Sequence, residues 1–254
     1  MWITERFVLK SNKGKVKKMI LAIDSSSLVA TVGIISENAI IAEYTVNLKK
    51  THSQTLLCMI DEIFKMTGIP KSDIKAIAIS DGPGSFTGLR IGASTAKGIA
   101  MALNIPIITV SSIELMAYNY NHCNKMICPI MDARRNHVYT GLFMCEEDEM
   151  TTIVEPCTIP MEELVQVVKK HNKKTIFIGD GVDAFREYID ENLDTEHTYG
   201  LPHMNRQKAS ALGSIALKMF NSGKVLDADT FAPQYLRLSQ AERERMENDK
   251  DNAR

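Results

Sequence analysis

The order in which β-rich and helical patterns follow one another constrains the fold of this 254-residue chain more than any other feature. Three β-rich runs, separated by very short polar breaks, are predicted at 19–24, 29–36 and 39–47. Such short connections join antiparallel neighbours, because a parallel pair needs a long crossover. Apolar residues then recur at spacings of three and four over 52–67, which predicts a helix ending at Gly68. The chain therefore opens as a meander of three strands followed by a helix.

Strands and helices alternate after this meander. A strand at 74–80, a glycine-rich turn at 81–84, a helix near 86–103 and a strand at 106–110 complete a βββαβα unit with one added strand. The second half repeats the same order less clearly, with a further amphipathic helix at its end. Its predicted elements are strands at 125–132, 137–145 and 151–158, a helix at 160–171, a strand at 174–179, a helix start within 179–190 and the last helix at 206–222.

This duplicated order selects one fold class. A meander before the alternation is not the order of a doubly wound dinucleotide fold, in which strands and helices alternate from the start. It is the order of the ribonuclease H-like unit shared by actin, Hsp70 and sugar kinases (the ASKHA group), so we predict an α/β protein with two such lobes. We expect residues 19–111 to form the amino-terminal lobe and 112–237 the carboxy-terminal lobe. Residues 238–254 form a charged tail without apolar anchors.

The net charge of −1 conceals an asymmetry between the start of the chain and the rest. Residues 1–18 carry six basic side chains against Glu5, a net charge of +5, which leaves residues 19–254 with a net charge of −6. We interpret 1–18 as an upstream start or a cloning remnant, with a genuine basic arm as the alternative. An acidic body does not resemble a binder of phosphate backbones, whose affinity comes mainly from clustered Lys and Arg.

Composition excludes several classes of protein. A hydrophobic share of 44% excludes disorder, and the longest apolar stretch, Ile99 to Val110, is interrupted by Asn104 and Pro106. It falls short of the roughly 20 residues that a membrane-spanning helix needs, and no signal peptide is recognisable at the start. Five widely spaced cysteines contain no C-x-x-C pair, so we expect reduced core thiols in a cytoplasmic protein.

Two turns would hold the phosphates of ATP in a two-lobed fold of this class, each after an acidic residue that ends a first strand. The first candidate is the turn at Asp24, Ser25 and Ser26, extended by Ser27. A carboxylate there can position a metal ion, and small hydroxyl residues leave backbone N–H groups free to meet phosphate. Asp and Ser are equally ordinary turn formers, so a structural role is the alternative.

The second turn follows Asp132, where Arg134 and Arg135 replace the expected glycine and small hydroxyl residues. Two arginines could contact an anion or a carboxylate, or they could form a solvated charged turn. Because only half of a nucleotide clamp is recognisable, an autonomous ATPase or ATP-dependent phosphotransferase is kept as the alternative function and not as the first hypothesis.

The glycine-rich segment 81–92 matches neither G-x-G-x-x-G nor a Walker A sequence. In the helix that it opens, small residues recur every four positions and therefore share one face: Gly88, Gly92, Ala96 and Ala100. Each glycine costs about 1 kcal/mol relative to alanine in a helix, which indicates a compensating packing need. That need is either tight packing in the core or a helix-to-helix subunit interface, with Arg90 at its rim.

A self-contained catalytic constellation is missing from the sequence. No pair of histidines has the H-x-x-x-H or H-E-x-x-H spacing of a helix-borne metal site. His52 begins the first long helix, where local hydrogen bonding is favoured over a ligand role. No G-x-S-x-G elbow accompanies the serines, so a serine hydrolase is not supported.

Five segments together resemble the TsaB family, also called YeaZ: ILAIDSSS, THSQTL, SDGPGSFTGLRIG, MDARRNHVY and PQYLR. The resemblance spans about residues 19–237. The GPGSFTGLRIG segment is shared with a catalytic paralogue, TsaD, whereas the DAR turn and the closing PQYLR favour TsaB. The resemblance implies a bacterial cytoplasmic protein required to form threonylcarbamoyladenosine (t6A) in tRNA.

What the resemblance implies further is a noncatalytic scaffold. TsaD transfers the threonylcarbamoyl group, the ATPase TsaE completes the assembly, and the scaffold alone forms a homodimer. It would have no catalytic residue, metal or cofactor of its own, with ATP or ADP and a metal on the partner subunits and tRNA bound only through the complex. The implied partner interface uses the first two helices, and its candidate residues are His52, Gly88, Arg90, Gly92 and Ala96.

Two further expectations accompany the resemblance. A bulky residue at Gly92 or Ala96 should weaken assembly without unfolding the monomer. Position 137, a glutamate in much of the family, is His137 here, so the family's role for that side chain does not carry over. A glycoprotease-like peptidase is a third and weaker alternative, for which these residues offer no support.

Overall fold

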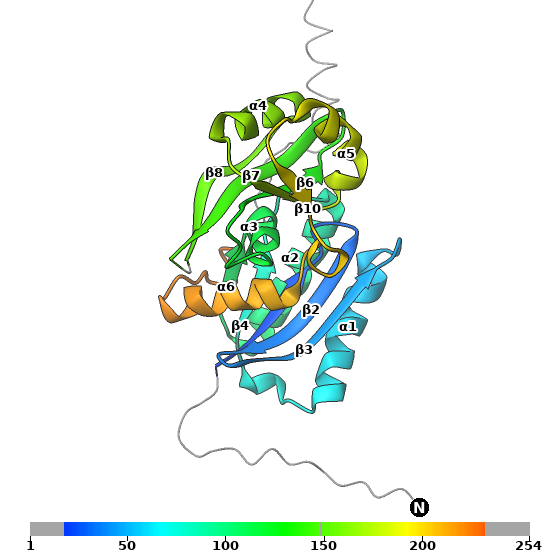
Figure 1. The fold of residues 1–254 in the computed structure, drawn as a ribbon. Helices are drawn as coiled ribbons and strands as arrows, with labels where there is room; N and C mark the ends of the chain where they lie inside the picture. The colour runs from blue at the N-terminus through cyan, green and yellow to red at the C-terminus, as the bar shows by residue number, and fades with distance from the viewer. Residues whose placement is uncertain (1–17, 148, 232–254) are drawn as a thin grey trace, which may run out of the picture.

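Two five-stranded sheets, each with its own helices, form two lobes that are joined through α3 and α6 (Figure 1). The structure is a computed structural model, and it describes residues 18–147 and 149–231. The predicted leader, apart from Lys18, and the predicted tail lie outside the described residues, as does the PQYLR segment.

The first sheet has the strand order β3-β2-β1-β4-β5. The meander strands pair antiparallel, while β1 pairs parallel with β4 and β4 with β5, as the short and long connections predict. The predicted elements of this lobe are confirmed. They are β1 (Met19–Asp24), β2 (Val29–Ser36), β3 (Ala39–Asn47), α1 (His52–Thr67), β4 (Ile74–Ser80), α2 (Phe86–Leu103) and β5 (Ile107–Val110).

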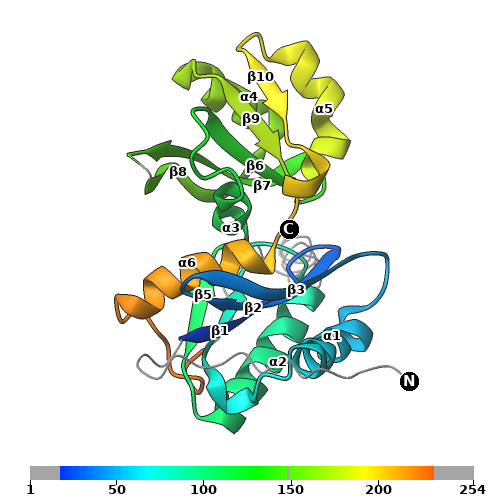
Figure 2. The ribbon, with the colours of Figure 1, turned by 60° about the horizontal axis from the view of Figure 1, so that its bottom comes forward.

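The second sheet has the order β8-β7-β6-β9-β10, which repeats the topology of the first. The duplication predicted from the sequence is therefore confirmed, and Figure 2 shows the two lobes apart. The elements of this lobe are β6 (Met126–Asp132), β7 (His137–Glu146), β8 (Glu149–Pro160), α4 (Met161–His171), β9 (Thr175–Ile178), α5 (Gly181–Asn192) and β10 (His197–Tyr199).

Two helices connect the lobes. Helix α3 (Ser112–Tyr118), which the sequence reading missed, packs on β6 and β7 after the first lobe ends. Helix α6 (Ala209–Asn221) returns to the first sheet, where Leu212 and Ala216 join a buried cluster with Ile20 and Ala22 of β1. Within the predicted carboxy-terminal lobe, 112–237, residues 209–221 therefore pack on the first sheet instead. The apolar side of α6 covers the face of the first sheet that α1 and α2 leave open.

The chain also closes on the first lobe after α6. Ile107 and Leu226 exchange two backbone hydrogen bonds, of 2.9 and 2.8 Å, which extend the sheet beyond β5. Ala228 and Phe231 are then buried in the cluster beneath α1 and α2. Both the first and the last described segments thus belong to the amino-terminal lobe. No helix within residues 18–147 and 149–231 is long and apolar enough to cross a membrane.

Candidate functional site

The β1–β2 turn, the first predicted phosphate turn, is buried. Asp24 and Ser26 are 0% exposed and Ser25 is 1% exposed. The Ser25 hydroxyl donates to the carbonyl of Gly88 at 2.9 Å, and the Ser26 hydroxyl donates to Asp24 at 3.0 Å. The Ser27 hydroxyl donates to Oε1 of Gln207 at 3.0 Å. Each serine hydroxyl of the turn is thus engaged within the protein.

The carboxyl group of Asp24 is adapted to this buried setting. Burial raises its pKa, against the lowering effects of the Ser26 hydrogen bonds and the nearby His52. Burial therefore leaves Asp24, Ser25 and Ser26 no exposed surface for a nucleotide. No group of three or more His, Cys, Asp or Glu in the described part of the chain is arranged to hold a metal ion.

The second turn, between β6 and β7, is built from left-handed residues. Arg134, Arg135 and Asn136 have φ angles of 68°, 54° and 57°, a conformation more usual for glycine. The Asn136 carbonyl accepts from the backbone N–H of Met161 at 2.9 Å, and a bond of 2.8 Å joins Nδ1 of His137 to the Arg135 carbonyl. The guanidinium of Arg134 is 85% exposed and lies 3.3 Å from the Asp132 carboxylate. This is a charged surface turn without a glycine cradle.

The predicted small-residue face of α2 points inward. Gly88, Gly92, Ala96 and Ala100 are all buried. A Cβ atom on Gly88 would collide with the Ser25 carbonyl, and one on Gly92 with the Ser25 hydroxyl. Gly88, Gly92 and Ala96 are therefore not surface contacts, which corrects the interface assignment. The spacing identifies a face that is free of side-chain bulk, but it does not say which neighbour that face meets.

Of the remaining two interface candidates, only Arg90 is exposed. Its guanidinium stacks over the Phe86 ring, 5.0 Å from the centroid. His52 is half-buried, and its Nε2 donates to the Ser27 carbonyl at 2.7 Å. His52 thus fixes the first helix to the β1–β2 turn, a tertiary contact in place of the local hydrogen bond expected from the sequence.

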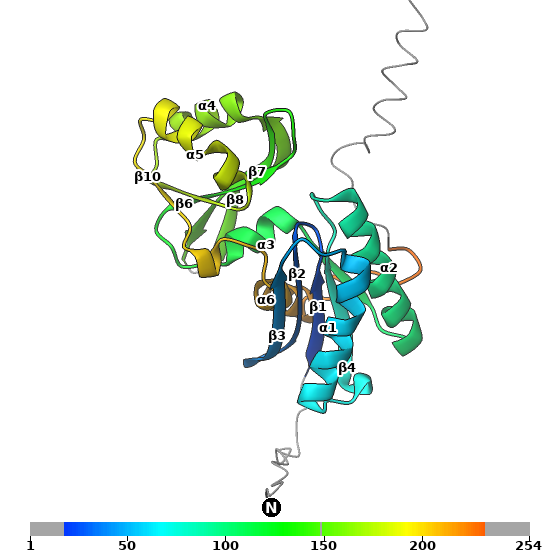
Figure 3. The same ribbon diagram turned by 90° about the vertical axis from the view of Figure 1, so that its right-hand side faces the viewer.

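The outer side of α2 carries a second series at the same spacing, which the sequence reading missed. Its members lie two positions after the buried series, on the opposite side of the helix, and all are exposed: Arg90, Ser94, Gly98 and Ala102. A Cβ atom on Gly98 would meet nothing within 4 Å. On α1, which contacts α2 and lies beside it (Figure 3), Leu57 is 59% exposed. We call the exposed sides of α1 and α2, with Leu57 and the series from Arg90 to Ala102, the outer helix face.

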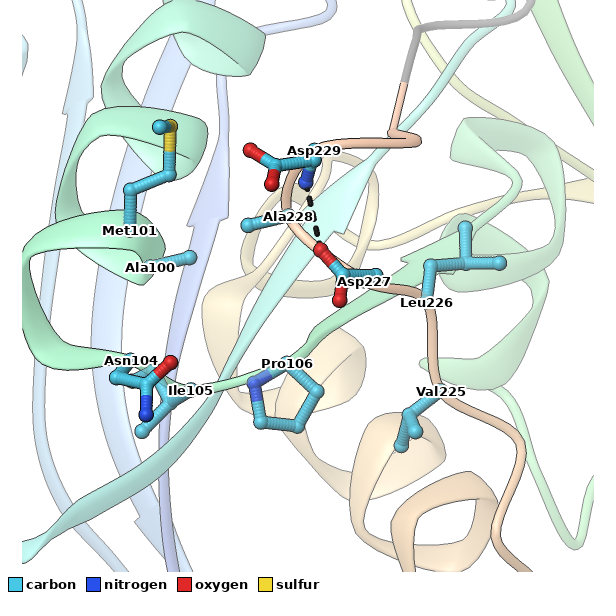
Figure 4. A pocket seen from close by; sticks show the side chains of 10 residues that line it. All are labelled: Ala100, Met101, Asn104, Ile105, Pro106, Val225, Leu226, Asp227, Ala228 and Asp229. Carbon is cyan, nitrogen blue, oxygen red and sulfur yellow. Dashed lines mark hydrogen bonds between the residues drawn. The ribbon is translucent and has the colours of Figure 1, made fainter.

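A pocket lies beside the carboxyl end of α2. It has a volume of about 550 Å³ and is lined by that helix end, residues 104–106 and the segment 225–229 (Figure 4). Met101 on one side and Leu226 on the other are 56% and 43% exposed. The Asp227 carboxylate accepts from the backbone N–H of Asp229 at 2.8 Å, so it stabilises its own turn.

A second pocket, of about 330 Å³, lies between the lobes and is acidic. Asp81 of the first lobe, Glu114 of α3 and Glu155 of β8 line it. Burial raises the pKa of Asp81 and of Glu114, and the carboxylates of Asp81 and Glu155 raise that of Glu114 further. Like charges therefore converge where the two lobes meet.

Two lobes of the same βββαβα order, joined by helices that cross between them, define an actin-like protein of the ASKHA class. The family model described as TsaD: tRNA N6-adenosine threonylcarbamoyltransferase matches residues 39–245. The chain is 32% identical over 231 residues to the tRNA threonylcarbamoyladenosine biosynthesis protein TsaB of Bacillus subtilis, covering 91% of this chain and 99% of that protein. The chain belongs to the TsaB (YeaZ) family.

Further relatives agree with this assignment. Identity to TsaB of Escherichia coli is 29% over 224 residues, covering 86% of this chain and 94% of that protein. The solved structure "YeaZ from Pseudomonas aeruginosa" superposes with a TM-score of 0.71 and 25% identity, covering 86% of this chain and all of that one. By contrast, the tRNA N6-adenosine threonylcarbamoyltransferase of Phocaeicola vulgatus matches over 65 residues only, 26% of this chain and 19% of the enzyme.

Proposed function

We propose that this protein is a noncatalytic scaffold subunit in t6A biosynthesis on tRNA, which binds TsaD and supports it together with TsaE. Membership of the TsaB family supports the role in t6A biosynthesis, because relatives named for that process match almost the whole described chain. The finer proposal, a scaffold in place of an enzyme, is supported by the engaged hydroxyls of the β1–β2 turn. ATP or ADP and a metal would then be bound by the partner subunits.

The outer helix face is the proposed docking surface for TsaD. The single observation that carries this proposal is the exposed series of α2, because small side chains at Ser94, Gly98 and Ala102 let another helix backbone approach closely. Leu57, on the neighbouring helix α1, adds exposed apolar area. In the absence of TsaD, the same face would pair two copies of this chain. The protein would act in the cytoplasm and reach tRNA only through the complex, in keeping with its acidic body.

Solution mass measurements with purified cognate TsaD test the proposal. We expect a stable complex with the natural chain and at least a tenfold loss of affinity for Gly98→Leu. The matched control is Gln166→Leu, which places the same side chain on exposed α4 of the second lobe. Absence of a complex with active TsaD would overturn the scaffold proposal. Unchanged affinity of Gly98→Leu would overturn the docking surface alone.

The rival activities have weaker support. A phosphotransferase would use Asp24 to Ser26, which are buried and engaged. A second Pseudomonas aeruginosa structure is described as an uncharacterized protein with similarity to peptidase YEAZ, and it superposes with a TM-score of 0.72 at 24% identity. That likeness concerns the fold, and no metal-holding group within the described residues supports a metallopeptidase.

A further inference from the structure

We infer that the segment 204–208, here called the strut, is a rigid connection between the lobes. The buried side chain of Gln207 contacts both lobes, so the chain itself fixes the angle between them. Gln207 is 1% exposed, although amide side chains are mostly found at protein surfaces. It is the residue where this connecting segment passes from the second lobe to the first. The inference does not depend on the proposed function.

Two residues attach the strut to the second lobe. The Asn205 side chain accepts from the backbone N–H of Gly179 at 2.8 Å, and the Arg206 guanidinium donates to the Gly179 carbonyl at 3.0 Å. The same guanidinium donates to the Asp183 carboxylate at 2.8 Å. Both backbone groups of Gly179 are thus used, and the fork geometry of arginine fixes the direction of the segment.

Helix α3 also holds the strut. The side-chain amide of Asn119, at the end of α3, donates to the carbonyls of Met204 and Arg206 at 3.2 and 2.8 Å. Two carbonyls of the strut are therefore fixed by one amide group. A segment held by α3 and by Gly179 has little freedom to follow a movement of the first lobe alone.

The attachment to the first lobe begins at Gln207. Its Oε1 accepts from the Ser27 hydroxyl at 3.0 Å, while its Nε2 lies 3.7 Å from the sulfur of Met131 in β6. One side chain therefore touches the β1–β2 turn of the first lobe and the central strand of the second. A buried amide left without these partners is strongly unfavourable, so the contacts favour a single arrangement.

The start of α6 completes the attachment. The backbone N–H of Ala209 donates to the Thr31 hydroxyl at 3.2 Å, and that of Ser210 donates to Glu43 at 3.4 Å. Helix α6 then packs on the first sheet. In many two-lobed proteins a bound ligand sets the degree of closure. Here a covalently continuous segment, bonded on both sides, spans the same kind of junction and can set it without a ligand.

Hydrogen exchange measured by mass spectrometry on the full chain tests the strut. In Gln207→Ala we expect amide exchange at least tenfold faster in peptides covering 24–31 and 131–139, with peptides from α1 unchanged. The control Gln166→Ala removes the same side chain from the exposed surface of α4 and should change none of these peptides. Unchanged exchange at both junction peptides in Gln207→Ala would overturn the inference.

A second variant guards against general unfolding of Gln207→Ala. Ser27→Ala removes the hydroxyl group that donates to Gln207, and it leaves the Gln207 side chain itself unchanged. We expect faster exchange in the same two junction peptides, by a smaller factor, and none in α1. Two outcomes in Ser27→Ala would overturn the strut: an equal rise in exchange in α1 and in the junction peptides, or no rise in either. In both cases Gln207 would be an ordinary core residue.

Discussion

The hydroxyl of Ser25 occupies the place that a side chain on Gly92 would need. This contact explains why α2 tolerates glycine in its interior despite the conformational cost. It also gives a matched pair of substitutions. We expect Gly92→Ala to destabilise the protein by about 1–3 kcal/mol through overpacking, and Gly98→Ala to stabilise it by up to about 1 kcal/mol through helix propensity. Urea unfolding of the two variants checks the pair. Equal changes in the free energy of unfolding would contradict the difference in packing between the buried and the exposed side of α2.

Glu114 should make stability depend on pH. Its pKa is raised in the folded state, so its contribution is complete below the unfolded pKa and is lost as the pH rises through the folded pKa. Glu114→Gln should therefore stabilise the protein at pH 7, and the gain should vanish as the pH falls below the ordinary pKa of a glutamate. Thermal unfolding across this range measures the gain. The exposed Glu62→Gln serves as control, and a gain that persists at low pH would refute the explanation.

Titration calorimetry with Mg-ATP should give no saturable heat for the isolated chain. The reason is geometric, because the Ser25 and Ser26 hydroxyls are engaged and Asp24 is wholly buried. Saturable binding near one nucleotide per chain would contradict this expectation. It would also revive the phosphotransferase alternative.

Reactivity toward a thiol reagent should differ between Cys58 and Cys128. Cys58 is exposed on α1, whereas Cys128 is buried in β6, where burial raises the pKa of its thiol to about 12. An aromatic disulfide reagent should label Cys58 in the native protein and Cys128 only after unfolding. Comparison with Cys58→Ser assigns the signal. Rapid native labelling of Cys128 would show that the second lobe opens readily.

The order of strands and helices could be predicted from local patterns, because periodicity and short breaks depend on neighbouring residues. Short elements such as α3 and β10 were missed, since a few residues carry too little periodicity. The destination of α6 was also missed. Its amphipathic pattern predicts a buried side. The pattern does not predict that this side packs on the first sheet, whose strands lie almost two hundred residues earlier in the chain.

The sequence indicated which segments have unusual residues but not how they are oriented. The turn at Asp24 to Ser26 was a candidate for nucleotide binding and the series from Gly88 to Ala100 for close packing, and the structure joins the two to each other and buries both. The exposed series from Arg90 to Ala102 has the same spacing. A single sequence cannot distinguish the inward from the outward side when both consist mainly of small residues.

The return of α6 to the first sheet has a consequence for synthesis on the ribosome. The second lobe is an insertion between β5 and α6, so the amino-terminal lobe lacks one of its covering layers until residues near Leu217 have emerged. The face of β1 that carries Ile20 and Ala22 is not covered by α6 until that helix has been synthesised. The insert can therefore finish folding before its host, which reverses the usual order in which domains mature from the amino terminus.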